Sequence, residues 1–337
     1  MVPRRQVVGA WLLLGGFCSL WLGVAWDGQW HVDVGPDTFF TAPHLMFYFG
    51  TALIGLTSLV VVLRSQQDTG PALRVLGLRT PLPFLVGGLG AAGHLVYGAV
   101  DLWWHTIYGF DILESTPSHL SLSLAMQVQA VAVIMAFAAL RTTTSGRWGL
   151  VAAAAFNVAA SSILLDGADI GINLPVLGGG AISAWTLCAV AGITRSAWWV
   201  LALGLVFVAV QAATYFFPPL ATELYANGIG QPIRDNALGL PLVALAMPLV
   251  FPLVAVVAAA AVRFARRRDL SPVATMTALG AVAGLVAALY MTLFDGAGSN
   301  PLVNIPVITA IGALAGRFGW QCAALMRRLG SRTAVTV

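Results

Sequence analysis

The stretch TAPHLMFYFGTALIGLTSLVVVL, residues 41–63, contains a Pro-His pair and continues as an almost unbroken apolar run that ends before Arg64. A helix needs about 20 mostly apolar residues to cross a bilayer, and Pro is well tolerated in its first turn. The run is continuously apolar and does not alternate, which favours a membrane helix over a barrel strand. The stretch therefore predicts a transmembrane helix with an imidazole in its first turn.

Similar runs recur along the rest of the chain. Of its 337 residues, 59% are hydrophobic and 9% are charged, whereas a soluble domain has about 25% charged residues. This composition excludes a soluble enzyme, a disordered chain and a nucleic-acid-binding protein. We predict an all-α, polytopic membrane helical bundle embedded in a lipid bilayer. Its ten expected spans are residues 6–26, 41–63, 82–105, 117–140, 148–166, 174–194, 196–217, 240–262, 272–294 and 305–326.

The ten expected spans place most basic residues on one side of the membrane and most acidic residues on the other. With a cytoplasmic N-terminus, 16 of the 17 basic residues, all of them Arg, fall on the inner side, and Arg234 is the exception. This asymmetry is the positive-inside signal. Eleven of the 13 acidic residues fall on the outer side. We therefore expect a multi-pass protein of the plasma (inner) membrane whose functional face is the outer one.

The expected helices pair into hairpins, in which an outward helix ends near an Asp and a Pro opens the returning helix. These pairs are Asp27 and Pro43, Asp101 and Pro117, Asp166 and Pro175, Asp235 and Pro241, and Asp295 and Pro306. Such recurrence indicates internal duplication. We divide the chain into residues 1–145, which hold the two most similar hairpins, and residues 146–337, whose hairpins contain no histidine.

The first two hairpins repeat one constellation of polar side chains. Both read D-x3-H-x3-G-x-D-x5-P, followed by His at once or after one residue. An Asp and a His four residues apart lie on one face of a helix, and the second His opens the helix that returns. One carboxylate and two imidazoles are thus expected to converge on one metal ion. The candidate ligands are Asp27, His31 and His44 in the first copy and Asp101, His105 and His119 in the second.

The donor set alone leaves the metal and the role open. Two imidazoles and a carboxylate suit copper, zinc or non-haem iron. The competing interpretation is that each Asp only orients its histidines by hydrogen bonds at the membrane interface. In either case, four of the chain's five histidines lie in these two copies.

Three further residues accompany the repeats. His94 lies seven residues before Asp101, hence on the same helix face and about 10 Å deeper. We interpret it as a catalytic proton relay or an additional ligand, or else as a hydrogen-bonded packing histidine. Asp37 and Asp111 occupy matching loop positions, where they either orient the histidines from behind or are solvated loop acids.

Both copies resemble the C subunit of the copper membrane monooxygenases, which are the particulate methane and ammonia monooxygenases. The first copy contains Asp37-Thr38 and Thr41-Ala42-Pro43-His44, and the second contains Thr116-Pro117-Ser118-His119. The resemblance covers residues 27–47 and 101–121 and leaves six of the expected helices outside it.

The resemblance implies copper at an Asp/His/His site formed by the first copy. It implies that the second copy forms the family's Asn/His/His site, with Asp101 in place of the Asn. It also implies partner membrane subunits and oxidation of a small apolar substrate by dioxygen.

Two other functions compete with this oxidoreductase. The first is a metal transporter or acquisition protein, in which the outer acids would concentrate cations. The inner halves of the expected helices carry almost no ionisable side chain, which argues against transport. The second is a structural membrane subunit whose metal ions only staple the hairpins.

Overall fold

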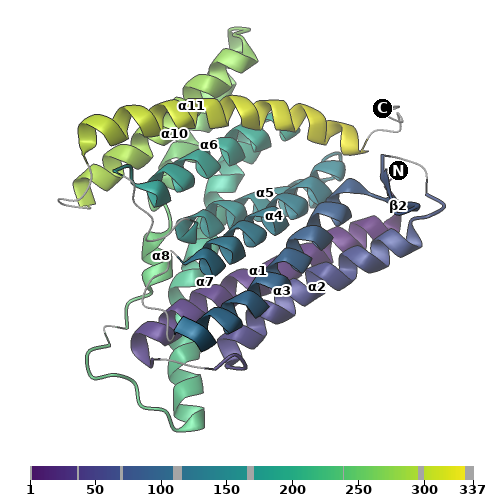
Figure 1. Cartoon of the computed structure of the whole chain (residues 1–337). Helices are drawn as coiled ribbons and strands as arrows, with labels where there is room; N and C mark the ends of the chain where they lie inside the picture. The colour runs from purple at the N-terminus through teal and green to yellow at the C-terminus, as the bar shows by residue number, and fades with distance from the viewer. Residues whose placement is uncertain are drawn as a thin grey trace.

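The computed structural model describes residues 2–35, 38–68, 71–108, 116–164, 171–237, 239–294 and 300–330. Within these ranges the chain forms a bundle of α-helices (Figure 1). Nine helical stretches in the described ranges are long and apolar enough to cross a membrane. The protein is therefore an all-α, multi-pass membrane bundle, which confirms the predicted fold class.

The helices follow one another in the order of the expected spans. They are α1 (Arg4–Asp33), α2 (Ala42–Arg64), α3 (Leu82–Tyr108), α4 (Pro117–Ala139), α5 (Thr144–Ala160), α6 (Leu174–Thr194), α7 (Ala197–Ile229), α8 (Leu242–Ala246), α9 (Phe251–Arg267), α10 (Pro272–Phe294) and α11 (Pro301–Met326). Two short 3-10 turns, Ser161–Ile163 and Arg327–Gly330, complete the helical structure of the described ranges.

The expected span 148–166 forms a helix that is too short to be counted among the nine spanning stretches. It is α5, which has 17 residues and falls below the length needed to cross a bilayer, about 20 residues. Its residues Leu150, Ala154 and Val158 are fully buried, because α5 packs against α1, α4, α6 and α7. The boundary that we expect at residue 145 lies in the first turn of α5, and the division into two halves stays a prediction.

Two helices extend past prolines that were expected to lie at their ends. Helix α7 continues through Pro218 and Pro219 and ends only at Gly230, whose φ of 71° gives it a left-handed conformation. The expectation that Pro306 opens the last helix is wrong, because α11 begins at Pro301 and contains Pro306 in its interior. The side chain of Asn300 accepts a hydrogen bond from the backbone N–H of Leu302 at 3.0 Å, and this cap starts the helix earlier.

The other expected hairpins agree with the structure where it describes them. Pro43, Pro117 and Pro175 all lie in the first turn of a helix, whereas Asp166 and Asp295 lie outside the described residues. The expected span 240–262 is a broken helix, since the chain leaves the helical conformation between α8 and α9 around Pro248.

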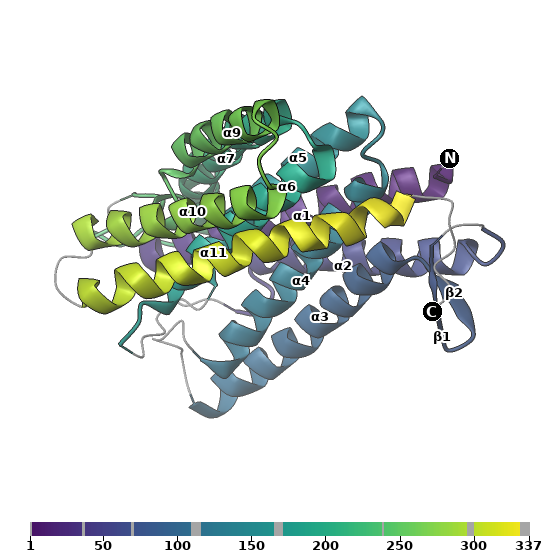
Figure 2. The ribbon, with the colours of Figure 1, turned by 90° about the horizontal axis from the view of Figure 1, so that it is seen from above.

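A small β-hairpin between α2 and α3 was not expected. Strands β1 (Leu73–Val75) and β2 (Leu78–Thr80) pair antiparallel, with Val75 opposite Leu78. The two turn residues, Leu76 and Gly77, have φ values of 50° and 79°, which matches the hairpin turn whose twist suits the flanking strands. The hairpin lies at the same end of the bundle as the N-terminus (Figure 2).

Helix α1 is the centre of the bundle. It packs against α2, α4, α5, α7 and α8, and its residues Leu13, Phe17, Leu20 and Trp21 have 1% exposure or less. The indole N–H of Trp21 donates a 2.9 Å hydrogen bond to the hydroxyl of Thr214 in α7. Helix α1 is therefore held by helices that precede and follow residue 145 in the chain.

The remaining helices pack in two groups. Helices α1 and α2, and α3 and α4, form adjacent antiparallel pairs, and α2 also packs against α3. Helices α6, α10 and α11 form a second closely packed group, in which α10 and α11 run side by side (Figure 2). Because α1 to α4 are joined in order, the end of α1, the start of α2, the end of α3 and the start of α4 all lie at one end of the bundle.

Candidate metal centres

The first triad lies where α1 ends and α2 begins. Asp27 and His31 are one turn apart near the end of α1, and His44 is in the first turn of α2. The Nε2 atom of His44 is 3.0 Å from Oδ1 of Asp27, and Nε2 of His31 is 3.7 Å from the same oxygen. The two imidazole centroids are 6.5 Å apart. The three side chains therefore converge on one point between two helices, as the spacing predicts.

The second triad repeats this arrangement between α3 and α4. Asp101 and His105 are one turn apart near the end of α3, and His119 is in the first turn of α4. The Nε2 atoms of His105 and His119 are each 3.4 Å from an oxygen of Asp101, the first from Oδ2 and the second from Oδ1. Their ring centroids are 5.8 Å apart.

Both triads can hold a metal ion. In each one the three donor atoms lie within 4.8 Å of one another, and donors that share a transition-metal ion at about 2.1 Å are separated by up to roughly 4 Å. Oδ1 of Asp27 and Oδ1 of Asp101 are shielded from solvent, and they lie beside histidine Nε2 atoms of their own triads. A buried carboxylate is destabilising unless its charge is compensated, and a cation bound between these side chains would compensate it.

The helix dipole is a second reason why a cation would be stabilising beside each Asp. Asp27 and Asp101 lie near the C-terminal ends of α1 and α3, where the partial negative charge of the helix end disfavours a carboxylate. Side-chain exposures between 18% and 34% in the two triads leave both sites accessible to an ion from the aqueous phase.

The residues just before the second histidine of each triad set its position at the start of the returning helix. Pro117 occupies the first turn of α4, and the hydroxyl of Thr116 accepts a hydrogen bond from the backbone N–H of His119 at 3.4 Å. This N-cap satisfies a backbone donor that the helix leaves unpaired. Thr41 precedes α2 in the same way but is used differently, since its hydroxyl accepts a hydrogen bond from the N–H of Thr38 at 3.0 Å. The threonines thus shape both turns that lead into the sites.

A close contact between backbones sets the geometry of the first site. Gly23 is one turn before Asp27, and Phe47 follows His44 by three residues. A Cβ atom added to Gly23 would lie 2.6 Å from the backbone N of Phe47, closer than van der Waals contact permits. Only glycine therefore lets α1 and α2 approach closely enough to bring Asp27 to 3.0 Å from His44.

Arg234 contacts the first site although no sequence argument assigns it there. Its Nη1 donates to the backbone carbonyls of His31 and Val32 at 3.3 and 3.4 Å, and its backbone N–H donates to the carbonyl of Asp33 at 2.8 Å. The last carbonyls of a helix lack partners within the helix, and a cation is stabilising there. The signal in the sequence is that Arg234 is the one arginine expected on the outer side.

Replacing Arg234 by Ala is expected to weaken metal binding at the first site about three- to tenfold, less than the loss of a group that hydrogen-bonds a ligand ring. The reason is that Arg234 holds the backbone of the ligand His31 and not its imidazole. Competitive metal titration of the purified protein measures this. Arg263→Ala is the matched control, because Arg263 makes no hydrogen bond or ion pair with a described residue. Equal affinities in both variants would contradict the assigned role of Arg234.

Aromatic residues from α7 support the same end of α1. Trp26 packs edge-on against Phe217 and Tyr225, with ring centroids 5.9 and 5.8 Å apart, and Trp30 lies 5.1 Å from Tyr225. Tyr225 belongs to the part of α7 that continues beyond Pro218 and Pro219. The unexpected length of α7 therefore provides a wall beside the first site.

Tyr48 lies between the two triads, and sequence analysis did not single it out. It follows His44 by one turn of α2, and a Cβ added to Gly98 of α3 would lie 2.6 Å from the Tyr48 hydroxyl. Gly98 precedes Asp101 by three residues. The packing of α2 against α3 thus brings the two sites to one interface.

His94 is buried at this interface. Its ring centroid is 6.1 Å from that of Phe47 and 6.4 Å from that of Tyr48. Its Nδ1 makes no hydrogen bond with any described residue, and it belongs to neither group of metal donors. A role for His94 in proton transfer stays a prediction.

The surroundings of the triads are partly described. Asp37 and Asp111, the expected outer partners of the histidines, lie outside the described residues. The buried Asp33 accepts a hydrogen bond from Nε2 of Gln29 at 2.6 Å. All six expected ligands lie in the described ranges and form two groups of three. The chain matches no protein-family model, no curated protein and no solved structure, so the functional argument depends on the two groups themselves.

Proposed function

We propose that the protein is a copper-binding membrane subunit of an oxygenase, similar to the C subunit of the copper membrane monooxygenases. The observation that carries the proposal is the repetition of one donor set in one helix-turn-helix setting at one end of the bundle. Hydrogen bonding at an interface does not require two copies with the same spacing. Copper is chosen over zinc or iron because the residues around the triads resemble that family.

The proposal places both sites on the outer face of the plasma membrane. This orientation follows from the positive-inside rule, since the arginines cluster at the opposite helix ends. Arg4 and Arg5 begin α1, and Arg64 ends α2, away from both triads.

Copper bound at the triads would supply the one-electron chemistry that dioxygen activation needs. The carboxylates of Asp27 and Asp101 would offset its charge, and the imidazoles of each hairpin would fix its position between two helices. The second triad lies beside an apolar surface, since Leu102, Trp103 and Ile107 of α3 are between 46% and 55% exposed. A small apolar substrate dissolved in the bilayer would reach the site along this surface.

The test is dioxygen-dependent oxidation of a short alkane by membranes that contain the protein with the chains that co-purify with it. We expect His44→Ala to lower the rate at least tenfold, because a catalytic metal site loses one of its three ligands. The Arg263→Gln variant controls for expression and membrane insertion. Elemental analysis of the same samples should find copper in the active protein.

Three results would overturn the proposal in different ways. Zinc in place of copper would exclude redox chemistry at the sites. If the membranes retained copper and every co-purifying chain but oxidised no alkane, the metal would be structural and would only staple the hairpins. Copper flux across reconstituted vesicles, lost in the His44→Ala variant, would assign a transporter.

A further inference from the structure

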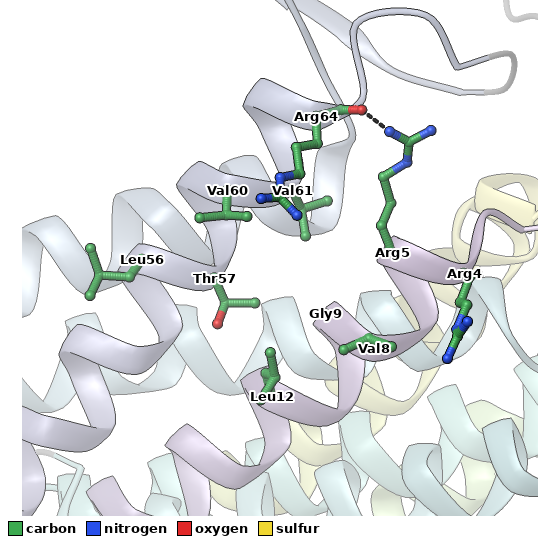
Figure 3. A pocket seen from close by; sticks show the side chains of 10 residues that line it. All are labelled: Arg4, Arg5, Val8, Gly9, Leu12, Leu56, Thr57, Val60, Val61 and Arg64. Atoms are coloured by element: carbon green, nitrogen blue, oxygen red, sulfur yellow. Dashed lines mark hydrogen bonds between the residues drawn. The ribbon is translucent and has the colours of Figure 1, made fainter.

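An apolar groove lies at the end of the bundle opposite the triads, between the start of α1 and the end of α2 (Figure 3). Its volume is about 500 Å³. Val8 and Leu12 of α1 and Leu56 and Val60 of α2 line its apolar part. These four side chains are between 43% and 63% exposed, and because they belong to membrane-spanning helices, the groove opens toward the lipid.

Basic residues stand at one end of this groove. Arg4 comes from the first turn of α1 and Arg64 from the last turn of α2, and both line the groove. Figure 3 shows the Arg64 side chain pointing toward Val60 and Val61, whereas the Arg4 side chain lies at the edge of the groove and points away from α2. Neither side chain makes a hydrogen bond or ion pair with a residue in the described part of the chain. Among the described residues, these two guanidinium groups therefore have no anionic partner.

The neighbouring arginine, in contrast, is paired. Arg5 is held by the carboxylate of Asp68 at 2.6 Å and by the backbone carbonyl of Arg64. Asp68 is thus already paired with Arg5. Arg4 and Arg64 remain as positive charges where the bilayer meets water.

We propose that the groove binds one anionic phospholipid, with its phosphate at the end lined by Arg4 and Arg64 and an acyl chain along Val8, Leu12, Leu56 and Val60. Guanidinium groups match phosphate oxygens in geometry and charge. Basic pockets between membrane helices on the cytoplasmic side are typical sites for acidic lipid headgroups. Arg64 and Leu56 are eight residues apart on α2, or about 12 Å. The lipid's acyl chain can therefore lie along an apolar path of this length. The site is independent of the metal centres.

Native mass spectrometry of the purified protein with phosphatidylglycerol or phosphatidylcholine tests the proposal. We expect one phosphatidylglycerol to bind more tightly than phosphatidylcholine, and Arg4→Gln/Arg64→Gln to weaken its binding roughly 30-fold, because each basic residue contributes about a fivefold factor near a membrane surface. The control is Arg263→Gln/Arg267→Gln, which removes two exposed arginines of α9 that line no part of the groove. This control should bind the lipid as the unmodified protein does.

A second variant tests the acyl-chain path without changing charge. Val60→Trp fills the groove from a position that is 46% exposed, so the helix can accept the larger side chain, and we expect it to lower phosphatidylglycerol binding at least tenfold. Inorganic phosphate should compete weakly, since it offers no acyl chain. The proposal is overturned if the α9 control loses the lipid equally, if Val60→Trp binds it normally, or if phosphate alone displaces it at similar concentrations.

Discussion

Protein purified in native lipid should lose all bound metal in the His31→Ala/His105→Ala variant, whereas each single substitution should remove one of two ions. Each histidine contributes one of only three donor atoms in its triad. The two triads use residues from different helix pairs, so loss of one site leaves the other intact. Elemental analysis normalised to protein concentration measures the number of ions per chain.

His94→Gln is the matched control for this experiment. His94 is the one histidine of the chain outside the two triads, and Gln keeps a polar side chain in its buried position. We expect two ions in this variant. If the double variant retained its metal, the two triads would not be the binding sites, and if His94→Gln lost an ion, His94 would be a ligand.

Gly23→Val should abolish metal binding at the first site and leave the second site filled. A side chain at this position meets the backbone N of Phe47 at 2.6 Å and its Cβ at 2.9 Å, so α1 and α2 must separate beside the triad. Ligand distances in metal sites hold to about 0.2 Å, and overpacking of this kind costs about 1–3 kcal/mol. Metal titration in the His105→Ala background isolates the first site, and thermal unfolding records the loss of stability.

Gly15→Val separates this effect from the lower helix propensity of valine. Gly15 lies in the same helix, two turns earlier, and a Cβ added there meets nothing within 4 Å. We expect Gly15→Val to bind metal at the first site with unchanged affinity. Normal binding by Gly23→Val would show that the close approach of the helices does not set the Asp27–His44 distance.

The triads could be predicted from the sequence because their geometry is local. Four residues separate Asp27 from His31 on one helix, and a short loop ending in Pro43 brings His44 back beside them. Each step follows from helix periodicity and turn chemistry. The same reasoning predicted the second triad and most of the membrane spans, since long apolar runs form helices in lipid wherever they occur.

Other features were not predictable because they depend on distant contacts or on weak local signals. Arg234 reaches the carbonyl of His31 across 203 positions of sequence, and no periodicity links the two. The Leu76-Gly77 turn lacks the Asn-Gly or Asp-Gly pair that marks a hairpin. Pro306 resembles the prolines that open helices, but the cap formed by Asn300 places the helix start elsewhere.

The central position of α1 makes the two sites mechanically unequal. Asp27 is carried by a helix enclosed by α2, α4, α5, α7 and α8, whereas Asp101 is carried by α3, which packs mainly against α2 and α4. The first site therefore lies on the most enclosed of the helices that carry the triads. The second site joins the peripheral helix α3 to α4, which packs against α1 and α5.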